Sequence, residues 1–381
     1  MYKYRLLAPG PTPVPETALL AMARPAIHHR EPEFKPIFAA CREGLKYVFQ
    51  TERDVVILAA SGTGAMESAV TNFLRRGDRA LYVNGGKFGE RWGKILKAYG
   101  CDPVELKVEW GRAVDPAAVR EALDADPSIR AVYVQASETS TAVRHPVEEI
   151  ARITRDRDVL LVVDGITAVG VFPLPMDEWG IDVLVTGSQK ALMLPPGLAF
   201  IAWSEKAERF LETSDLPKFY FDLKAEQKKQ QENQTAYTPA VSLIVGLREA
   251  LDRIRAETLE GVHDRTARMA RATREAAKAL GLELFAPESP SDACTAILMP
   301  EGVDGQAFKK ALRERFSMTV AGGQDQAKGK IIRISHMGYL DPMDVVAAVS
   351  ALELTLREFG RPVELGRGVA AALSVLGGES R

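Results

Sequence analysis

Cysteine and histidine are scarce in this chain, and their spacing excludes several kinds of site. The 381 residues include five histidines and three cysteines, Cys41, Cys101 and Cys294. The cysteines form no CxxC pair and the histidines form no HExxH motif, so the sequence predicts neither a disulfide framework nor a metal site. Few and widely spaced cysteines are typical of a reducing compartment. We therefore expect a cytoplasmic protein.

An excess of charge of either sign is also missing, as is any long apolar run. Lysine and arginine number 49, aspartate and glutamate number 51, and the formal net charge is −2. A nearly neutral chain gives no reason to expect nucleic acid or an anionic membrane surface as a partner. No apolar run approaches the roughly 20 residues of a membrane-spanning helix. The N-terminus lacks the charged-then-apolar pattern of a secretory signal.

The apolar residues that are present form short runs that alternate with helical patterns. They make up 46% of the chain, which favours a large core in one large domain with a smaller one beside it. Val159–Val163 and Ile181–Thr186 are continuous apolar runs, as in parallel strands covered on both faces. Asp164 follows the first run and Lys190 follows the second. Because ligands of such sheets bind beyond the carboxyl ends of the strands, we expect both residues at one site.

An acid and an amine at two strand ends suit the cofactor pyridoxal 5′-phosphate. In enzymes that use it, a lysine holds the cofactor covalently and an acid pairs with the ring nitrogen. Each residue alone has a simpler interpretation, because Asp164 also fits a helix N-cap and Lys190 a solvated loop residue. Lys190 lies in the string GSQKALMLPPG, just after a predicted buried strand and before mostly apolar residues, which is not typical of a solvated surface lysine. The two residues together therefore favour the cofactor.

This stretch resembles the class V aminotransferases of the alanine–glyoxylate and serine–pyruvate type. Six separate motifs carry the resemblance over nearly the whole chain, to about residue 360. It implies an α/β fold, the type I fold of pyridoxal-phosphate-dependent aminotransferases, with a large domain on a mostly parallel sheet and a smaller α+β C-terminal domain. The expected parts are an N-terminal arm over 1–16, the large domain over 17–257 and the small domain over 258–381.

The resemblance also implies how the cofactor is held. A Gly/Ser/Thr loop over 61–65 opens a predicted helix, where free backbone N–H groups and the helix dipole favour a phosphate. The expected contacts are Thr63, Gly64, Ala65 and Gln189 at the phosphate, Phe88 on the ring face, Thr139 at the phenolic oxygen, and Asp164 and Lys190. Many relatives carry tryptophan where this chain has Phe88. Simpler interpretations are a plain helix cap for the loop, core packing for Phe88 and a Ser/Thr turn for Thr139.

The resemblance places the substrate near an arginine of the small domain and a glycine of the N-terminal arm. Arg333 interrupts the apolar strand predicted over 330–335, and its guanidinium can bind a carboxylate through two parallel hydrogen bonds. It matches the family's substrate-carboxylate arginine, and a structural salt bridge is the alternative. Gly10 lies in the Pro-Gly-Pro segment that the family places near the active site. The arm over 1–16 contains four prolines, so we expect no regular element there.

Residues 234–240 resemble the segment that reaches the neighbour's phosphate in the family dimer. Thr238 matches this segment and is expected to contact the cofactor. A phosphate-binding tyrosine is often found at the position of Thr235, whereas the tyrosine of this chain is Tyr237. Which of the two replaces the usual contact stays open. The resemblance implies a homodimer with shared active sites.

These features predict a transaminase that moves an amino group from alanine or serine to glyoxylate or pyruvate. Lys190 is expected to act as base and acid at the substrate Cα, while Asp164 keeps the ring nitrogen protonated. A lyase or desulfurase on the same fold would need a cysteine nucleophile on a mobile loop, and none of the three cysteines is well placed. A non-catalytic subunit of a complex would have no use for Asp164, Lys190 and Arg333 together.

Overall fold

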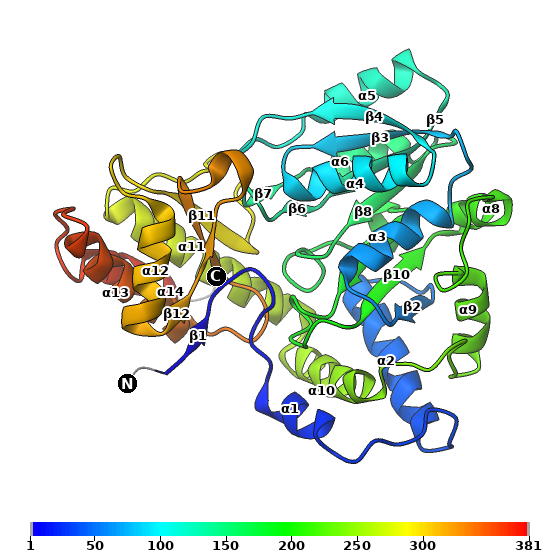
Figure 1. Ribbon diagram of the computed structural model, residues 1–381, viewed down its shortest axis with the longest axis horizontal. Helices are drawn as coiled ribbons and strands as arrows, with labels where there is room; N and C mark the ends of the chain where they lie inside the picture. The colour runs from blue at the N-terminus through cyan, green and yellow to red at the C-terminus, as the bar shows by residue number, and fades with distance from the viewer. Residues whose placement is uncertain (1–2, 379–381) are drawn as a thin grey trace.

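A seven-stranded sheet forms the centre of the larger part of the molecule in the computed structural model, which describes residues 3–378 (Figure 1). In order across the sheet, the strands are β2 (Val55–Leu58), β10 (Ala199–Trp203), β9 (Val183–Gly187), β8 (Leu160–Asp164), β5 (Ile129–Gln135), β3 (Arg79–Asn84) and β4 (Asp102–Lys107). Among these seven strands, β10 alone runs in the direction opposite to the other six. The mostly parallel sheet of an α/β fold is therefore confirmed.

Helices lie on both faces of this sheet because its central strands, such as β8, β9 and β10, are buried on both sides, whereas the edge strand β4 is largely exposed. They are α1 (Glu16–Met22), α2 (Phe34–Phe49), α3 (Gly62–Thr71), α4 (Lys87–Ala98), α5 (Pro116–Ala125), α6 (Val147–Thr154), α7 (Met176–Trp179), α8 (Glu205–Thr213), α9 (Leu223–Gln231) and α10 (Val241–Glu257). Successive residues of a strand point to opposite faces. Leu161 of β8 accordingly packs in one hydrophobic cluster with Phe38 of α2, and Val162 packs in a second with Met66 of α3.

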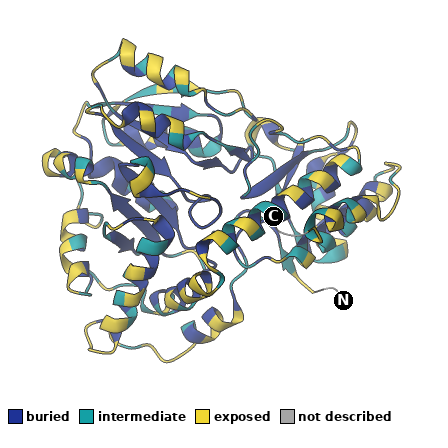
Figure 2. Ribbon diagram, turned by 180° about the vertical axis from the view of Figure 1, so that it is seen from behind, coloured by how far each residue is buried: buried dark blue, intermediate teal, exposed yellow. Residues whose placement is uncertain are grey.

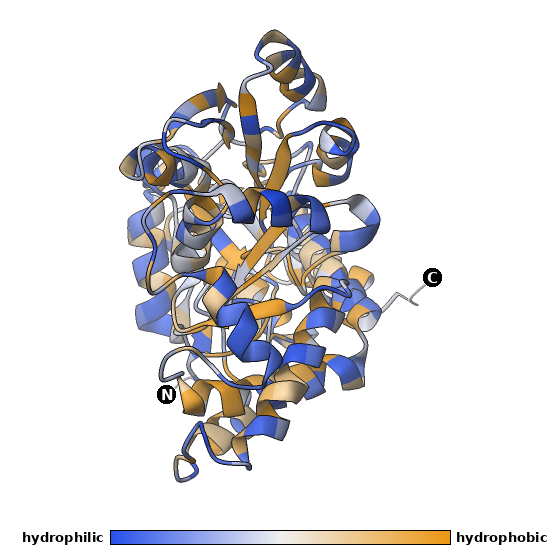
Figure 3. Cartoon of the chain, turned by 90° about the vertical axis from the view of Figure 1, so that its right-hand side faces the viewer, coloured by the Kyte–Doolittle hydropathy of each residue, from blue (hydrophilic) through white to orange (hydrophobic). Residues whose placement is uncertain are grey.

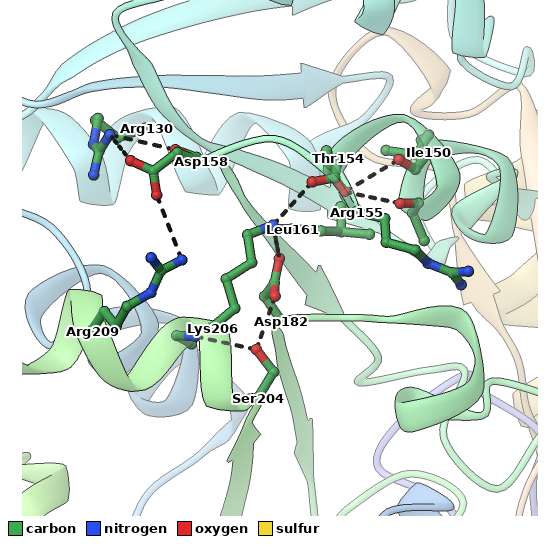
Figure 4. Close-up of polar contacts among 12 residues, drawn as sticks. Arg130, Ile150, Thr154, Arg155, Asp158, Leu161, Asp182, Ser204, Lys206 and Arg209 are labelled. Atoms are coloured by element: carbon green, nitrogen blue, oxygen red, sulfur yellow. Dashed lines mark hydrogen bonds and ion pairs between the residues drawn. The ribbon is translucent and has the colours of Figure 1, made fainter.

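A buried ion pair joins the N-terminal ends of β8 and β9, at the edge of the sheet opposite Asp164. Lys206 Nζ lies 3.1 Å from Asp182 Oδ2 and also donates to the carbonyl oxygen of Thr154 at 3.0 Å (Figure 4). Asp182 Oδ2 accepts the backbone N–H of Leu161 at 2.8 Å, and its Oδ1 accepts the hydroxyl of Ser204 at 2.9 Å. The carboxylate thus links the two strands to α8.

The C-terminal part contains a three-stranded antiparallel sheet of its own, in the order β11, β14, β13. Its elements are α11 (Leu259–Ala279), β11 (Cys294–Leu298), α12 (Gly305–Phe316), β12 (Met318–Thr319), β13 (Ala321–Gly322), η1 (Asp325–Ala327), β14 (Ile331–Ser335), α13 (Pro342–Glu358) and α14 (Arg367–Leu376). A third hydrophobic cluster, with Phe308 and Leu352, fills it. Thr258, with φ of 67°, separates α10 from α11 at the residue from which we expect the small domain to extend. Leu284 pairs with Ile297 of β11 in one isolated antiparallel bridge.

The distribution of apolar residues follows these layers. The central strands of the sheet are buried, and the outward faces of the helices are exposed (Figure 2). Strands in the interior of the molecule are strongly hydrophobic, whereas the peripheral helices carry hydrophilic faces (Figure 3). Over residues 3–378, none of the helices has both the length and the apolar character needed to cross a bilayer.

The N-terminal arm corrects the expectation that it holds no regular element. Arg5–Leu6 form β1 and pair in parallel with Met318–Thr319 of β12. The prolines of the arm begin at residue 9, so the residues before them keep the N–H groups that pairing needs. Leu7 is buried in the hydrophobic cluster of the small domain. The arm therefore packs against the small domain through Leu7, whereas Tyr4 is exposed.

Candidate active site

The structure brings the chain segments after β8 and β9 together at one cavity. Asp164 is the last residue of β8, and Lys190 follows β9 by three residues. The two strands are parallel neighbours, so their carboxyl ends lie at the same edge of the sheet. The residues that line the cavity are Ser61, Gly62, Thr63, Phe88, Arg91, Ser137, Thr139, Asp164, Ile166, Thr167, Gln189 and Lys190.

Asp164 presents one unpaired carboxylate oxygen at this cavity. Its Oδ1 accepts the backbone N–H of Ile166 at 2.8 Å, whereas no partner for Oδ2 occurs in residues 3–378. The side chain is buried, and burial raises the pKa of Asp164 to about 7, with the charge of Glu138 acting in the same direction. A cation against the free oxygen would favour the ionised form. The carboxylate therefore fits a protonated ring nitrogen.

The N-terminal arm holds Lys190 in place. Its Nζ donates a hydrogen bond to the carbonyl oxygen of Pro9 at 2.6 Å, and its own carbonyl oxygen accepts the hydroxyl of Thr12 at 2.7 Å. A Cβ added to Gly10 would lie 2.0 Å from this Nζ, so the approach of the arm requires glycine. Burial lowers the pKa of the Lys190 amine to about 8. A larger neutral, nucleophilic fraction of the amine is then present near neutral pH.

The start of α3 supplies the wall where the phosphate is expected. Thr63 lines the cavity together with Ser61 and Gly62. Gly64 and Ala65, also expected as contacts, do not line it: Gly64 faces Ala60 and Phe221, and Ala65 is buried under the sheet. The first N–H groups of a helix lack partners within the helix, so they are available to an anion.

Gln189 offers a further contact that fits a bound group. Its side chain lines the cavity, and its buried Oε1 has no hydrogen-bond partner in the described part of the chain. Buried polar atoms are rarely left unpaired. With the free Oδ2 of Asp164 and the amine of Lys190, this unpaired amide gives the cavity donors and acceptors suited to pyridoxal phosphate.

Phe88 and Arg91 of α4 form another wall of the cavity. The guanidinium carbon of Arg91 lies 5.0 Å from the centre of the Phe88 ring, and its Nη1 donates to the hydroxyl of Thr63 at 3.1 Å. Sequence reasoning missed Arg91. Residues three apart share one face of a helix, so the spacing from Phe88 could have identified it.

Thr139 lines the cavity with a second hydroxyl that sequence reasoning missed. The hydroxyl oxygens of Thr139 and Thr167 lie 2.7 Å apart, and Thr167 also donates to the carbonyl oxygen of Ser137 at 3.2 Å. Because that hydrogen bond uses the Thr167 proton, Thr139 donates to Thr167. The lone pairs of Thr139 remain available within the cavity.

Arg333 joins the small domain to this cavity through the backbone. It is buried on β14, where Nη1 donates to the carbonyl oxygen of Thr139 at 2.7 Å. Nε and Nη2 donate to the carbonyl oxygen of Gly322 at 3.1 and 2.8 Å. Within residues 3–378 no carboxylate pairs with it, so the alternative of a structural salt bridge is not observed. These bonds use one N–H of each terminal nitrogen, so one N–H of each is left for a further acceptor such as a carboxylate.

Thr238 does not line the cavity of its own chain. It lies between α9 and α10, beside Tyr237, whose ring stacks on Tyr220 at 5.2 Å and whose hydroxyl donates to the carbonyl oxygen of Phe219. The rings of Phe219 and Tyr220 are largely exposed. Thr235 donates to the carbonyl oxygen of Tyr237 at 2.6 Å. The segment thus carries an exposed aromatic patch outside the cavity.

Comparison with known sequences identifies relatives of the whole chain. The family profile described as "Aminotransferase class-V" matches residues 16–347. A Synechococcus protein named "Soluble hydrogenase, small subunit" is 44% identical over 98% of both chains. The L-aspartate–glyoxylate aminotransferase of Paracoccus denitrificans is 38% identical over 96% of this chain and 94% of its own. The serine–glyoxylate aminotransferase of Methylorubrum extorquens is 38% identical over 97% and 95%.

A solved structure agrees with these relatives. The ureidoglycine–glyoxylate aminotransferase of Bacillus subtilis superposes with a TM-score of 0.94 at 27% identity and covers 99% of each chain. The α/β fold, with its mostly parallel sheet and smaller C-terminal part, is therefore that of the pyridoxal-phosphate-dependent aminotransferases. The protein belongs to the class-V aminotransferases and is an enzyme that depends on pyridoxal phosphate.

Proposed function

We propose that this enzyme transfers the amino group of alanine or serine to glyoxylate or pyruvate. The observation that carries the proposal is that Asp164 and Lys190 line one cavity. Arg333 of the small domain donates to the carbonyl oxygen of Thr139, which lines the same cavity. The names of the Paracoccus, Methylorubrum and Bacillus enzymes share glyoxylate and differ in the amino donor. Glyoxylate is therefore the acceptor that these relatives support best.

Each residue of the cavity has a distinct proposed task. When bound, pyridoxal phosphate withdraws electrons from the substrate Cα and so makes its proton acidic. Lys190 would hold the cofactor covalently and the free Oδ2 of Asp164 would pair with its ring nitrogen. The proposed phosphate contacts are Thr63, Gly64, Ala65, Gln189 and, from the second protomer, Thr238, with Phe88 at the ring face and Thr139 at the phenolic oxygen.

Lys190 also suits the movement of a proton at the substrate Cα. A pKa of about 8 leaves part of the amine neutral near neutral pH, so Lys190 can take a proton as a neutral base and return it as an ammonium group. The carbonyl oxygen of Pro9 accepts a hydrogen bond from the amine and so holds it next to the N-terminal arm. Gly10 leaves the space that this position requires.

Arg333 is the proposed site for the substrate carboxylate. Alanine, serine, glyoxylate and pyruvate share one carboxylate, so a single guanidinium can orient donor and acceptor alike. The carbonyl oxygens of Thr139 and Gly322 fix the guanidinium, and its two remaining N–H groups are free. Fixing the carboxylate orients the Cα–H bond for loss of its proton.

A desulfurase has less support because no cysteine is suited to attack a substrate. Cys41, Cys101 and Cys294 are all buried and unpaired. Burial raises the pKa of Cys101 and of Cys294 to about 11, and it raises that of Cys41 even more. A reactive thiol needs a lowered pKa and access to its substrate.

A non-catalytic role deserves its own comparison because one relative bears the name of a hydrogenase subunit. A subunit with only a structural function would not need a buried acid and a buried amine at one cavity, with a buried guanidinium nearby that has no carboxylate partner in residues 3–378. Such groups lower stability when they are left without a ligand. Their presence supports catalysis.

The proposed assembly is a homodimer in the cytoplasm with active sites shared between protomers. The support comes from Thr238, which does not line its own cavity and follows Tyr237 in the sequence. The ring of Tyr237 packs against the exposed rings of Phe219 and Tyr220. The arm gives no support, because it packs against its own chain. The three unpaired cysteines suit a reducing compartment.

A panel of substrate pairs tests the proposed function. Alanine, serine, aspartate and the decarboxylated amines would each be supplied with glyoxylate or pyruvate, and the amino acid formed would be measured. We expect glycine from alanine or serine with glyoxylate, and no product from the Lys190→Ala variant. If aspartate is the only amino donor that reacts, the proposed donor is wrong but the proposed transaminase activity stands. If no pair transfers an amino group, the proposed function is wrong.

A further inference from the structure

Glu138 is a fully buried carboxylate that none of the roles above uses. Its exposed fraction is 0%, and it lies in the chain between Ser137 and Thr139, which both line the cavity. Burying a carboxylate is costly unless hydrogen bonds compensate for the lost water. The contacts of this side chain therefore indicate what it does.

Four hydrogen-bond donors surround the Glu138 carboxylate. Oε2 accepts the backbone N–H of Phe88 at 3.1 Å and that of Gly89 at 2.9 Å. Oε1 accepts the backbone N–H of Ser140 at 3.0 Å and its hydroxyl at 2.5 Å. The Ser140 hydroxyl oxygen in turn accepts the backbone N–H of Lys87 at 2.9 Å. Because all four contacts are donors, the arrangement suits the ionised carboxylate.

These contacts cap the helix that carries Phe88 and Arg91. Lys87, Phe88 and Gly89 are the first three residues of α4, whose N–H groups have no acceptor within the helix. The residue before the helix, Gly86, has no side chain to cap it, and a Cβ there would lie 2.4 Å from Glu138 Cδ. A negative charge at a helix N-terminus is favourable. Glu138 therefore replaces the missing cap from about 50 residues away in the sequence.

We propose that Glu138 is a positioning residue for the cofactor. By fixing the first turn of α4 it sets where the Phe88 ring and the Arg91 guanidinium stand at the cavity. The same tip of the chain holds Thr139, whose carbonyl oxygen binds Arg333. One buried carboxylate thus fixes the position of Phe88 relative to that of Arg333. This inference rests on the proposed function, which assigns the ring face to Phe88.

The chain contains a matched control in Glu353. That side chain is 3% exposed and caps α14 in the same way, also from a distant position. It accepts the backbone N–H groups of Gly366 and Gly368 at 2.7 Å each and of Val369 at 3.1 Å. Glu353 belongs to α13 of the small domain, away from the residues that line the cavity. The helix capped by Glu138 contributes Phe88 and Arg91 to the cavity, whereas the helix capped by Glu353 contributes no lining residue.

The experiment compares Glu138→Gln with Glu353→Gln. Glutamine keeps the shape of the side chain but turns one acceptor oxygen into a donor that faces N–H groups. Both variants should therefore lower Tm. Only Glu138→Gln should weaken binding of added pyridoxal phosphate to the cofactor-free protein, by at least about tenfold in Kd, which is the effect of losing one hydrogen bond to a charged group. It should also change the circular dichroism of the bound cofactor, which reports its orientation.

Wild-type Kd and wild-type circular dichroism in Glu138→Gln would overturn the inference. If that variant does not fold, Ser140→Ala provides the test, because it removes one donor to Oε1 and the acceptor of the Lys87 N–H. Ser140→Ala should then shift the cofactor signal while leaving the fold intact, and an unchanged signal would again contradict the inference. These measurements need no turnover. A failure of the proposed function would instead appear as wild-type protein without transaminase activity.

Discussion

Pro9 and Lys190 are separated by 181 residues and joined by a hydrogen bond of 2.6 Å from the lysine amine to the proline carbonyl oxygen. The N-terminal arm therefore fixes the position of the Lys190 amine at the cavity. Its attachment begins at β1 and continues through the Thr12 hydroxyl, which holds the Lys190 carbonyl oxygen. Lys190 consequently depends on residues that precede the whole large domain.

The first prediction concerns the glycine next to that contact. Gly10→Ala should prevent the amine from reaching its position, because the new Cβ would lie 2.0 Å from Lys190 Nζ. Borohydride reduction of wild-type protein with pyridoxal phosphate should label Lys190, and the variant should lose most of this label while remaining folded. Gly77→Ala is the control, since it also has a positive φ, 82° against 111°, but open space around it. Full labelling of the Gly10 variant would contradict the prediction.

Asp164, Lys190 and Arg333 could be singled out from the sequence because each belongs to a local pattern. Asp164 and Lys190 follow apolar runs, and the rule that ligands bind beyond strand ends placed them together. Arg333 was noticeable as a charge within an apolar strand. Of the loop predicted to hold the phosphate, Thr63 lines the cavity with Ser61 and Gly62, whereas Gly64 and Ala65 do not line it.

Contacts between distant segments could not be predicted in the same way. The pairing of Glu138 with the start of α4 depends on two loops meeting in space, and neither loop has a periodicity that names its partner. The pairing of β1 with β12 is of the same kind, since two residues form no recognisable strand pattern. Such contacts follow from the completed fold rather than from local sequence.

The second prediction uses the pKa of Asp164. In the cofactor-free protein burial raises this pKa from 3.8 to about 7, so the native state binds a proton between these pH values that the unfolded state releases. Stability should therefore fall from about pH 4 to about pH 7 relative to Asp164→Asn. The difference should reach on the order of 4 kcal/mol and then stay constant. Urea unfolding across this pH range measures it.

Pyridoxal phosphate provides the internal check on this result. Its ring nitrogen would bring a positive charge to Asp164 Oδ2, so the cofactor should reduce the stability difference at neutral pH. A difference that is constant from pH 4 to pH 8 would show that asparagine changes packing instead of removing a buried charge.

The third prediction is that Arg333→Lys raises KM for the amino acid and for the oxo acid alike. Lysine keeps the charge but cannot reproduce the two parallel hydrogen bonds. The two free N–H groups of Arg333 would serve both substrates, and kcat/KM should fall by at least about tenfold. Amines without a carboxylate should be poor donors for the wild-type enzyme, and their kcat/KM should change little in the Arg333→Lys variant.

Arg42→Lys is the matched control for Arg333. Arg42 is also largely buried, and it pairs with Asp54 at 2.6 Å away from the residues that line the cavity. This variant should lower stability without changing KM for either substrate. A similar rise in KM from both variants would mean that Arg333 acts through the fold.

The fourth prediction concerns the buried ion pair of Figure 4. Asp182→Ala removes the acceptor for Lys206, Ser204 and the Leu161 N–H, and breaking a buried pair commonly costs about 3–5 kcal/mol. Chemical unfolding should show this loss, with near-normal activity in the molecules that remain folded. Glu205→Ala, which breaks an exposed pair with Arg53, should change stability little. Equal effects of the two variants would refute the prediction.

The last prediction tests whether active sites are shared. Lys190→Ala lacks the covalent anchor, and Thr238→Asp places a negative charge where the partner's phosphate is expected. Each variant alone should be inactive. Refolding them together should restore about a quarter of wild-type activity, because random pairing makes half of the dimers hybrid and each hybrid has one intact site. Lys190→Ala with Asp164→Ala should restore none, since both residues belong to the same cavity. Restoration by neither pair, or a monomer in sedimentation with full activity, would exclude a shared site and place the role of Thr238 within its own chain.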